Sequence, residues 1–461
     1  MNPLKAFLIS TVLFMSGCAQ SHLDIFPELK DPSLMERKIS VAELHQDIDA
    51  YVAGVRARHP DFERYADEQA LQQRVLELKQ HIDQPLTRVE FFRYVGQLSH
   101  LFNDGHSFLL WPYHEYGAAV AAKQQPFPFA VKEQDGALYL ARGYDQTVVK
   151  NTQSLPVGSQ IVSINGIAAE QIIAQAQLYV GGETQRLRDA FVAERFPFML
   201  WAVFGMLGEF ELELRHDAQV FTVNITSEQQ WQSQTVQAVD QDLDLQILQP
   251  GLAYLRVGSF DVEPEQFAAD IATHFAAIKQ QNIQHLIIDI RDNTGGNTDT
   301  ATELASYLAD APFKLVSQVT ERLNEDNRGW FGYKGSVGDI IVTPWTDEVK
   351  PKSEAKRFTG NVYVLIGPVT YSAAIVFATT VQDNRMGTLV GEPTGGYANQ
   401  TAQGNLFNLP HSQLRAYVAT RLLVRPNGAT AVTSVVPDIW VQPDMASGSD
   451  TALTKIKELV Q

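Results

Sequence analysis

The sequence predicts an α/β layered domain in residues 240–461. Short apolar runs that are typical of buried strands alternate in this region with segments whose apolar residues recur at helical spacing. Two of these strands, in 285–297 and 361–377, end in a glycine-containing turn that leads into a helical pattern. Repeated strand–helix units favour parallel pairing in a layered sheet. The 461 residues are 45% hydrophobic, so the chain can bury substantial cores, and its length suggests two to four domains.

The elements of this domain follow one another in chain order. The predicted strands are 251–257, 286–290, 362–366 and 388–390. The predicted helices are 261–280, a segment after Gly296 and a segment that begins near Ser372. The first of these helices carries its apolar residues on one face, as an amphipathic helix packed on a sheet does: Phe267, Ile271, Phe275 and Ile278.

The amino-terminal segment predicts export. Residues 1–17 carry one lysine and then a largely apolar stretch that is too short to span a bilayer, which is typical of a secretory signal peptide. The small residues before Cys18 resemble a bacterial lipobox, which implies lipidation of Cys18, and Ala19 resembles lipoproteins sorted to the outer membrane. The alternative is an ordinary signal peptide with a chance cysteine. We therefore expect an envelope protein on the periplasmic face, with 18–39 as a tether and a lipid anchor as its only membrane contact.

Composition excludes several other classes of function. Cys18 is the only cysteine, so no internal disulfide is expected. The net charge is −17, and the acidic residues are scattered, which favours solubility over a charged binding surface. No basic patch suggests nucleic acid. No HExxH motif or phosphate-binding loop occurs, so we expect neither a metal nor an organic cofactor.

Residues 40–115 predict a small helical domain. The sequences SVAE at 40–43 and TRVE at 87–90 are capping boxes that begin helices. The second predicted helix carries Phe91, Tyr94, Val95, Leu98 and Leu101 on one face. It leads into the turn Asn103-Asp-Gly105, which delivers His106.

Residues 125–226 resemble a reduced PDZ domain. The sequence GSQIVSING at 158–166 is a strand that ends in an Asn-Gly turn, and it is similar to the end of a PDZ domain. Such a module binds peptide carboxyl termini by strand addition. The loop that would receive the terminal carboxylate is not recognisable, so a structural module and a peptide-binding module remain equal alternatives. Residues 227–237, rich in Gln and Ser, are a predicted linker.

Ser372 is the candidate nucleophile. It stands where a strand gives way to a helix, beside free backbone N–H groups such as that of Ala373 and at the positive end of a helix dipole. These amides can hold the oxyanion that forms when a serine attacks an acyl carbon. A simple N-cap serine is the alternative.

Three motifs follow one another in the chain: DIRDNTGG at 289–296, TYSAA at 370–374 and VGEPT at 390–394. Their sequences and their order resemble the family of carboxyl-terminal processing (tail-specific) proteases, tricorn-core-like proteases and interphotoreceptor retinoid-binding protein. The resemblance implies a ClpP/crotonase-like core with Ser372 as nucleophile. It also implies an oxyanion hole made by the amides of Ala373 and of Gly295 or Gly296.

The resemblance also identifies a general base. LFNDGHS at 101–107 is similar to the segment that carries a histidine base in tricorn-like members, which assigns that role to His106; a structural histidine is the alternative. In the Ser–Lys members a lysine follows VGEPT, but Tyr397 occupies its place here. Because a tyrosine does not replace that base, a Ser–Lys dyad is excluded.

The acid that would orient the histidine is missing from its usual place. Where family members have glutamate, this chain has Ala431, which leaves Glu392 and Asp438 as candidates that serve equally well as structural residues. Asp289 and Arg291 are expected to form a structural charge pair below the glycine turn.

The sequence therefore predicts an envelope serine peptidase that acts on peptides or unfolded proteins. The alternative is a non-catalytic peptide- or ligand-binding lipoprotein of the same fold, because retinoid-binding relatives show that the fold need not cleave peptides. An α/β-hydrolase esterase is disfavoured, because TYSAA lacks the glycines of G-x-S-x-G. An acyl-CoA enzyme of crotonase type conflicts with the secretion signal.

Overall fold

The computed structural model describes residues 26–122, 124–141, 155–156, 158–225, 243–328, 335–447 and 449–460. The predicted signal peptide, the lipidation site Cys18 and the predicted linker 227–237 lie outside these ranges. Within them, no helix combines the length and the apolar character needed to cross a membrane.

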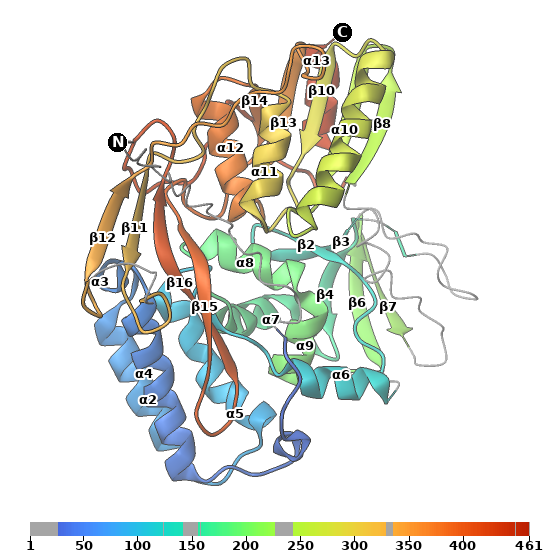
Figure 1. Ribbon diagram of the computed structural model, residues 1–461. Coiled ribbons are helices and arrows are strands. Elements are labelled where there is room, and N and C mark those ends of the chain that lie inside the picture. The colour runs from blue at the N-terminus through green and yellow to red at the C-terminus, as the bar shows by residue number, and fades with distance from the viewer. Residues whose placement is uncertain are drawn as a thin grey trace, which may run out of the picture.

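A six-stranded sheet forms the centre of the carboxyl-terminal region (Figure 1), in the order β17-β14-β13-β10-β9-β8. Five neighbouring strands pair in parallel, and β8 adds an antiparallel edge. The parallel pairing follows from the strand–helix alternation that the sequence predicts. The strands are β8 (Leu243–Gln249), β9 (Leu252–Val257), β10 (His285–Asp289), β13 (Asn361–Ile366), β14 (Thr388–Gly391) and β17 (Ile439–Trp440).

Helices cover both faces of this sheet. Alternate residues along β10 point to opposite faces of the sheet. Leu286 and Ile288 lie in the hydrophobic core on the face covered by α10, α11 and α12, whereas Ile287 lies in the core on the face covered by α13. The helices are α10 (Pro264–Gln280), α11 (Thr298–Ser306), α12 (Ala373–Asp383) and α13 (Thr451–Leu459). The first begins three residues later than predicted, at Pro264, because proline lacks an N–H group and fits the first helical position.

The amino-terminal region is helical, and both predicted capping boxes are present, at Ser40 and at Thr87. The helix predicted to run through Leu101 ends as α-helix at Val95, and Gly96–Phe102 continues as the 3₁₀-helix η2. Gly96 is a poor helix former at this change of geometry. The helices are η1 (Pro32–Met35), α2 (Val41–Arg58), α3 (Phe62–Tyr65), α4 (Glu68–His81), α5 (Arg88–Val95) and α6 (Tyr113–Ala121).

A second sheet lies in the middle region, in the order β2-β3-β4-β6-β7 with β5 beside β4. It shares one hydrophobic core with the amino-terminal helices, so the two regions pack as a unit. The PDZ resemblance and the domain boundaries stay predictions. The strands are β2 (Val131–Gln134), β3 (Ala137–Leu140), β4 (Gln160–Ile164), β5 (Ile167–Ala168), β6 (Phe210–His216) and β7 (Gln219–Ile225); the helices are α7 (Ala169–Ala176), η4 (Gln177–Tyr179), α8 (Gln185–Glu194) and α9 (Phe196–Phe204).

A third, antiparallel sheet joins the amino-terminal helices to the carboxyl-terminal region. In Figure 1 the long strands β15 and β16 run from the carboxyl-terminal region down beside the amino-terminal helices. Strand β1, two residues after His106, pairs with β16. This sheet therefore brings the predicted histidine to the region that carries Ser372. Its strands are β1 (Phe108–Leu109), β11 (Gln318–Arg322), β12 (Ile340–Pro344), β15 (Thr401–Asn408) and β16 (Arg415–Val424).

Candidate active site

Ser372 is the N-cap residue of α12, in the loop that follows β13. Its backbone has φ 54° and ψ −124°, a conformation that costs a non-glycine residue roughly 1–3 kcal/mol and recurs at functional sites. Its carbonyl oxygen accepts a 2.7 Å hydrogen bond from the side chain of Gln400. Its own side chain does not cap the helix. The amide of Ala373, in the first turn, has no hydrogen-bond acceptor among the described residues.

His106 follows a tight turn that its neighbours hold in place. Asn103 is left-handed, with φ 47°, and the amide of His106 donates to Oδ1 of Asp104 at 3.0 Å. The pairing of β1 with β16 then fixes the chain just beyond the histidine. As a result, Nε2 of His106 lies 2.9 Å from Oγ of Ser372. The structure thus brings the two predicted catalytic residues into hydrogen-bond contact.

The glycine turn of 289–296 packs against the candidate nucleophile. A Cβ atom on Gly295 would lie 2.5 Å from Cβ of Ser372, and one on Gly296 would lie 2.1 Å from the amide nitrogen of Asp261. Both glycines also have positive φ, 109° and 128°. The amide of Gly295 donates to Oδ1 of Asn293 at 2.8 Å, whereas that of Gly296 has no acceptor among the described residues. Of the two glycines, Gly296 therefore has the amide available to a ligand.

The other ring nitrogen of His106 faces two hydroxyl groups. Nδ1 lies 3.1 Å from Oγ1 of Thr401 and 3.0 Å from the hydroxyl of Tyr371. The Tyr371 ring also stacks on the imidazole, with 4.7 Å between centroids. A buried carboxyl group lies behind each hydroxyl: Thr401 donates to Asp104, and Tyr371 donates to Glu183 at 2.8 Å.

The two acids proposed from the sequence have other partners. Glu392 pairs with Arg186. Asp438 accepts the amide of Leu389 at 2.8 Å and thereby holds the start of β14. In the described structure, neither acid contacts His106. Both acids were candidates because they stand in or near the family motifs. In the structure they serve the local packing of the chain instead.

Burial sets the protonation of this cluster. Removal from water lowers the pKa of His106 to about 4, although the charge of Asp104 opposes the shift. Burial disfavours ionisation of Asp104 as well, but the hydrogen bond and charge of His59, with further support from His106 and Ser107, outweigh it and lower the pKa of Asp104 to about 2. Burial and the charge of Asp104 raise the pKa of Glu183 to about 8.

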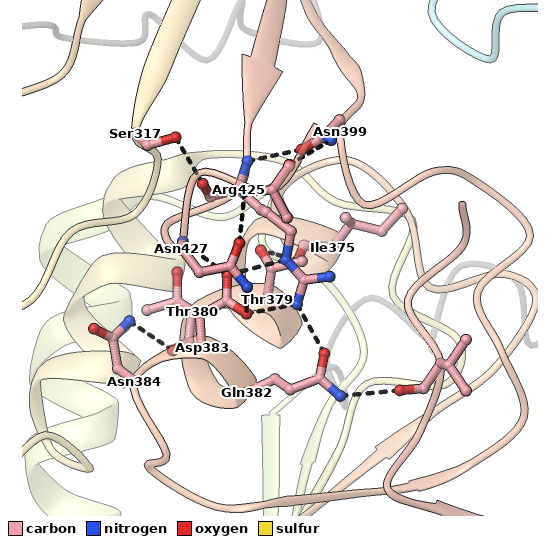
Figure 2. Close-up of polar contacts among 12 residues, drawn as sticks. Ser317, Ile375, Thr379, Thr380, Gln382, Asp383, Asn384, Asn399, Arg425 and Asn427 are labelled. Carbon is pink, nitrogen blue, oxygen red and sulfur yellow. Dashed lines mark hydrogen bonds and ion pairs between the residues drawn. The ribbon is translucent and has the colours of Figure 1, made fainter. Parts of the chain in front are cut away.

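A polar cluster ties the segment around Thr401 to the helix that starts at Ser372 (Figure 2). Asp383, at the end of α12, receives two hydrogen bonds from the guanidinium of Arg425, at 2.6 and 3.0 Å. The amide of Arg425 donates to Asn399 at 2.9 Å, two residues before Thr401. Asn427 adds two hydrogen bonds to the same carboxylate. Because bidentate Arg–carboxylate pairs are strong and directional, the cluster fixes Asn399–Thr401 relative to α12.

Sequence reasoning missed Thr401, Tyr371, Glu183 and Asp104 as parts of this site. Asp104 and Tyr371 were within quoted motifs, two residues before His106 and directly before Ser372, but Thr401 and Glu183 had no signal beyond their residue type. The expected pair of Asp289 and Arg291 is confirmed, at 2.6 Å. Within the described residues, no group of three His, Cys, Asp or Glu side chains is placed to hold a metal ion.

This geometry suits acyl transfer. A hydroxyl 2.9 Å from a neutral imidazole can lose its proton to Nε2 as it attacks a carbonyl carbon. The amide of Ala373 follows the nucleophile directly in the chain and has no acceptor in the described structure, so it can donate to an oxyanion. The arrangement therefore contains a nucleophile, a base and an amide donor.

The carboxyl-terminal region of this chain is similar in sequence to known peptidases. Residues 251–441 match the model of peptidase family S41. The tail-specific protease of Haemophilus influenzae (strain ATCC 51907 / DSM 11121 / KW20 / Rd) is 24% identical over 196 residues. That alignment covers 41% of this chain and 24% of the relative, so the chain spans about a quarter of that protein's length.

Two solved structures of CPAF share the fold of nearly the whole chain. Mature CPAF superposes with a TM-score of 0.67 at 16% identity, covering 91% of this chain and 97% of CPAF. Mature CPAF complexed with lactacystin gives 0.66 at 16% identity, with 91% and 98% covered. The likeness therefore includes the amino-terminal helices and the middle sheet in addition to the matched core.

Proposed function

We propose that this chain is a member of peptidase family S41 and an envelope serine peptidase that cleaves peptides or unfolded proteins, with Ser372 as nucleophile and His106 as general base. The contact of 2.9 Å between His106 Nε2 and Ser372 Oγ carries the proposal. A base that is neutral at physiological pH supports it as well, because only the neutral imidazole accepts a proton.

The proposed reaction has two halves. Ser372 Oγ attacks the carbonyl carbon of the scissile bond while its proton passes to His106 Nε2. His106 then gives this proton to the leaving amine, the carbon–nitrogen bond breaks, and an acyl-enzyme remains. Water, deprotonated by His106, hydrolyses the ester and regenerates Ser372.

The amides of Ala373 and Gly296 are the proposed oxyanion donors. Neither has another acceptor among the described residues, and preorganised donors of this kind lower the barrier because they need no reorientation during the reaction. The amide of Gly295 is a poorer candidate, since it already donates to Asn293.

The proposed location depends on the first residues of the chain. A signal peptide and a lipidated Cys18 would hold the enzyme at the periplasmic face, in the outer membrane. We expect wild-type protein in the membrane fraction of a bacterial host and Cys18→Ser protein in the soluble periplasmic fraction. Equal partition of the two proteins would contradict the lipid anchor and leave the peptidase proposal untouched.

A fluorophosphonate probe tests the chemistry directly. The soluble chain from Ser21 onward is treated with the probe, and the adduct is mapped by mass spectrometry. We expect phosphonylation of Ser372 that disappears in Ser372→Ala and in His106→Asn. The exposed Ser353→Ala serves as the control and should be labelled like the wild type.

The same experiment distinguishes the binding-protein alternative. A folded chain that resists the probe, also in the presence of candidate peptides, but still binds those peptides would overturn the peptidase proposal. Labelling that survives in His106→Asn would instead remove His106 from the mechanism and keep Ser372.

A further inference from the structure

In the described structure, no carboxylate is hydrogen-bonded to the imidazole ring of His106. In the described part of the chain, Nδ1 meets only the hydroxyls of Thr401 and Tyr371, at 3.1 and 3.0 Å. A general base nevertheless needs its Nδ1 hydrogen held in place, so that the lone pair of Nε2 faces the nucleophile. The two hydroxyls must supply that constraint.

The direction of each hydrogen bond follows from its partners. An ionised carboxylate only accepts, so the hydroxyl hydrogen of Thr401 points to Oδ1 of Asp104. The Thr401 oxygen is then an acceptor toward Nδ1 of His106. The Tyr371 hydroxyl behaves alike when it donates to Glu183. Both contacts favour the tautomer that carries hydrogen on Nδ1 and leaves Nε2 free to accept from Ser372.

Asp104 is the better fixed of the two acids. It is fully buried, and its oxygens receive the Thr401 hydroxyl, the Ser107 hydroxyl and the amide of His106 at 3.0 Å. Nε2 of His59 lies 3.2 Å from Oδ2, within ion-pair distance but without the geometry of a hydrogen bond, and the amide of Asp61 donates to the other nitrogen of that ring. These donors stabilise the ionised form.

Glu183 is held less completely. Its Oε2 atom is buried without a hydrogen-bond partner in the described structure, and its Oε1 atom accepts from Tyr371. Two carboxylates this close to one imidazole also repel each other, which favours one charge over two. The fixed charge near His106 is therefore that of Asp104.

We propose that Asp104 is the positioning acid of His106 and acts through the hydroxyl of Thr401. The proposal rests on the function proposed above. The Thr401 oxygen accepts the hydrogen on Nδ1. The negative charge of Asp104 polarises the Thr401 hydroxyl, which makes its oxygen a better acceptor and stabilises the imidazolium that forms when Ser372 loses its proton. The relay takes the place of the direct acid that Glu392 and Asp438 do not supply.

The test replaces Thr401 with the isosteric valine and with serine. Thr401→Val removes the hydroxyl, and loss of one hydrogen bond to a group that becomes charged in the reaction costs ~10- to 100-fold in rate, which we expect in the rate constant for labelling of Ser372. Thr401→Ser keeps the hydroxyl and should restore most of the rate. The matched control is Thr420→Val on β16, whose buried hydroxyl donates to the carbonyl of Gln403 at 2.8 Å, remote in role from His106.

Two further measurements separate positioning from general structural damage. The charged or titratable groups that face His106 are Asp104, His59, Arg195 and Tyr371, with Glu183 behind the hydroxyl of Tyr371. Losing the relay from Asp104 leaves the imidazolium less stabilised, so the acid limb of the labelling rate should move to lower pH in Thr401→Val. Nitrogen NMR of histidine-labelled protein should show the Nδ1–H tautomer of His106 in the wild type and in Thr401→Ser, with a reduced population in Thr401→Val.

The outcomes are distinguishable from failure of the proposed function. Wild-type labelling with an unchanged rate, acid limb and tautomer in Thr401→Val would overturn the relay and leave the peptidase proposal intact. If the wild type is not labelled, the peptidase proposal fails, and the tautomer populations still decide the relay. Thermal melting of each variant checks that the fold is kept.

Discussion

The Nε2 atom of His106 lies 2.9 Å from the Oγ atom of Ser372, although 266 residues separate them in the chain. The contact is made in a buried site, where the pKa of His106 falls to about 4. An ordinary histidine, with a pKa of about 6.5, is half protonated at pH 6.5, whereas His106 stays largely neutral there.

We expect the pH dependence of the labelling rate at Ser372 to follow the titration of His106. Because only neutral imidazole accepts the serine proton, the rate should stay constant as pH falls from 7.5 to 5.5 and reach half its value near pH 4. Stopped labelling reactions at each pH measure it, with near-ultraviolet circular dichroism as a check on folding. A midpoint at pH 6.5 or above would show that His106 is not the buried base described here.

Gly295 should be intolerant of a side chain. In Gly295→Ala the new Cβ would lie 2.5 Å from Cβ of Ser372, so the nucleophile must move, and a shift of about 1 Å can cost ~100-fold in rate. Gly136→Ala is the control: its φ is also positive, at 80°, but no atom lies within 4 Å of the new Cβ. Equal labelling rates in the two variants would contradict the packing argument.

Glu183 should make the fold less stable at alkaline pH. Its folded pKa of about 8 exceeds the ordinary 4.5, so the folded state holds a proton that the unfolded state has lost between these values. The stabilisation is complete below pH 4.5 and is lost as pH rises through 8, with a slope of up to about 1.4 kcal/mol per pH unit. Urea unfolding at several pH values should show Glu183→Gln gaining stability relative to the wild type from pH 5 to 8. A constant difference, like that expected of the exposed Glu354→Gln, would contradict it.

Local patterns predicted much of this structure. The capping boxes at Ser40 and Thr87 depend only on residues three positions apart in the chain. The apolar runs at 286–290 and 362–366 likewise predicted the buried strands of the central sheet. The junction at Ser372 was also visible, because a strand, a turn and a helix follow one another without interruption.

The surroundings of His106 were not predictable in the same way. Thr401 lies 295 residues away, and it reaches Nδ1 because β15 pairs with β16 while β16 pairs with β1. Strand register across separate regions sets that contact, and no local pattern encodes it. Glu392 and Asp438 were plausible by composition, but their side chains serve an ion pair and a strand start instead.

Tyr397 should be dispensable for the chemistry. It occupies the place of the lysine in Ser–Lys relatives, but its hydroxyl makes one described contact, a 3.4 Å hydrogen bond to the carbonyl of Glu183. Tyr397→Phe should therefore label Ser372 within about twofold of the wild type, the effect typical of a change outside a critical network. Loss of labelling in Tyr397→Phe would mean that this position still takes part in proton transfer.

The stability of the amino-terminal helices should depend on the ion pair of Arg88 and Glu115. Their side chains are 1% and 9% exposed and lie 3.0 Å apart, between α5 and α6. Arg88→Met leaves Glu115 without its counter-charge, and breaking a buried pair in this way costs roughly 3–5 kcal/mol. Urea unfolding followed by far-ultraviolet circular dichroism should show this loss.

Two companion variants give the prediction its control. The double variant Arg88→Met/Glu115→Leu should recover most of the lost stability, because it removes both buried charges and replaces them with apolar side chains. The exposed pair Arg56–Glu68, with side chains 47% and 45% exposed, is the matched surface case, and Arg56→Met should cost less than about 1 kcal/mol. If Arg88→Met costs no more than Arg56→Met, water reaches the Arg88 site and the pair is not buried in solution.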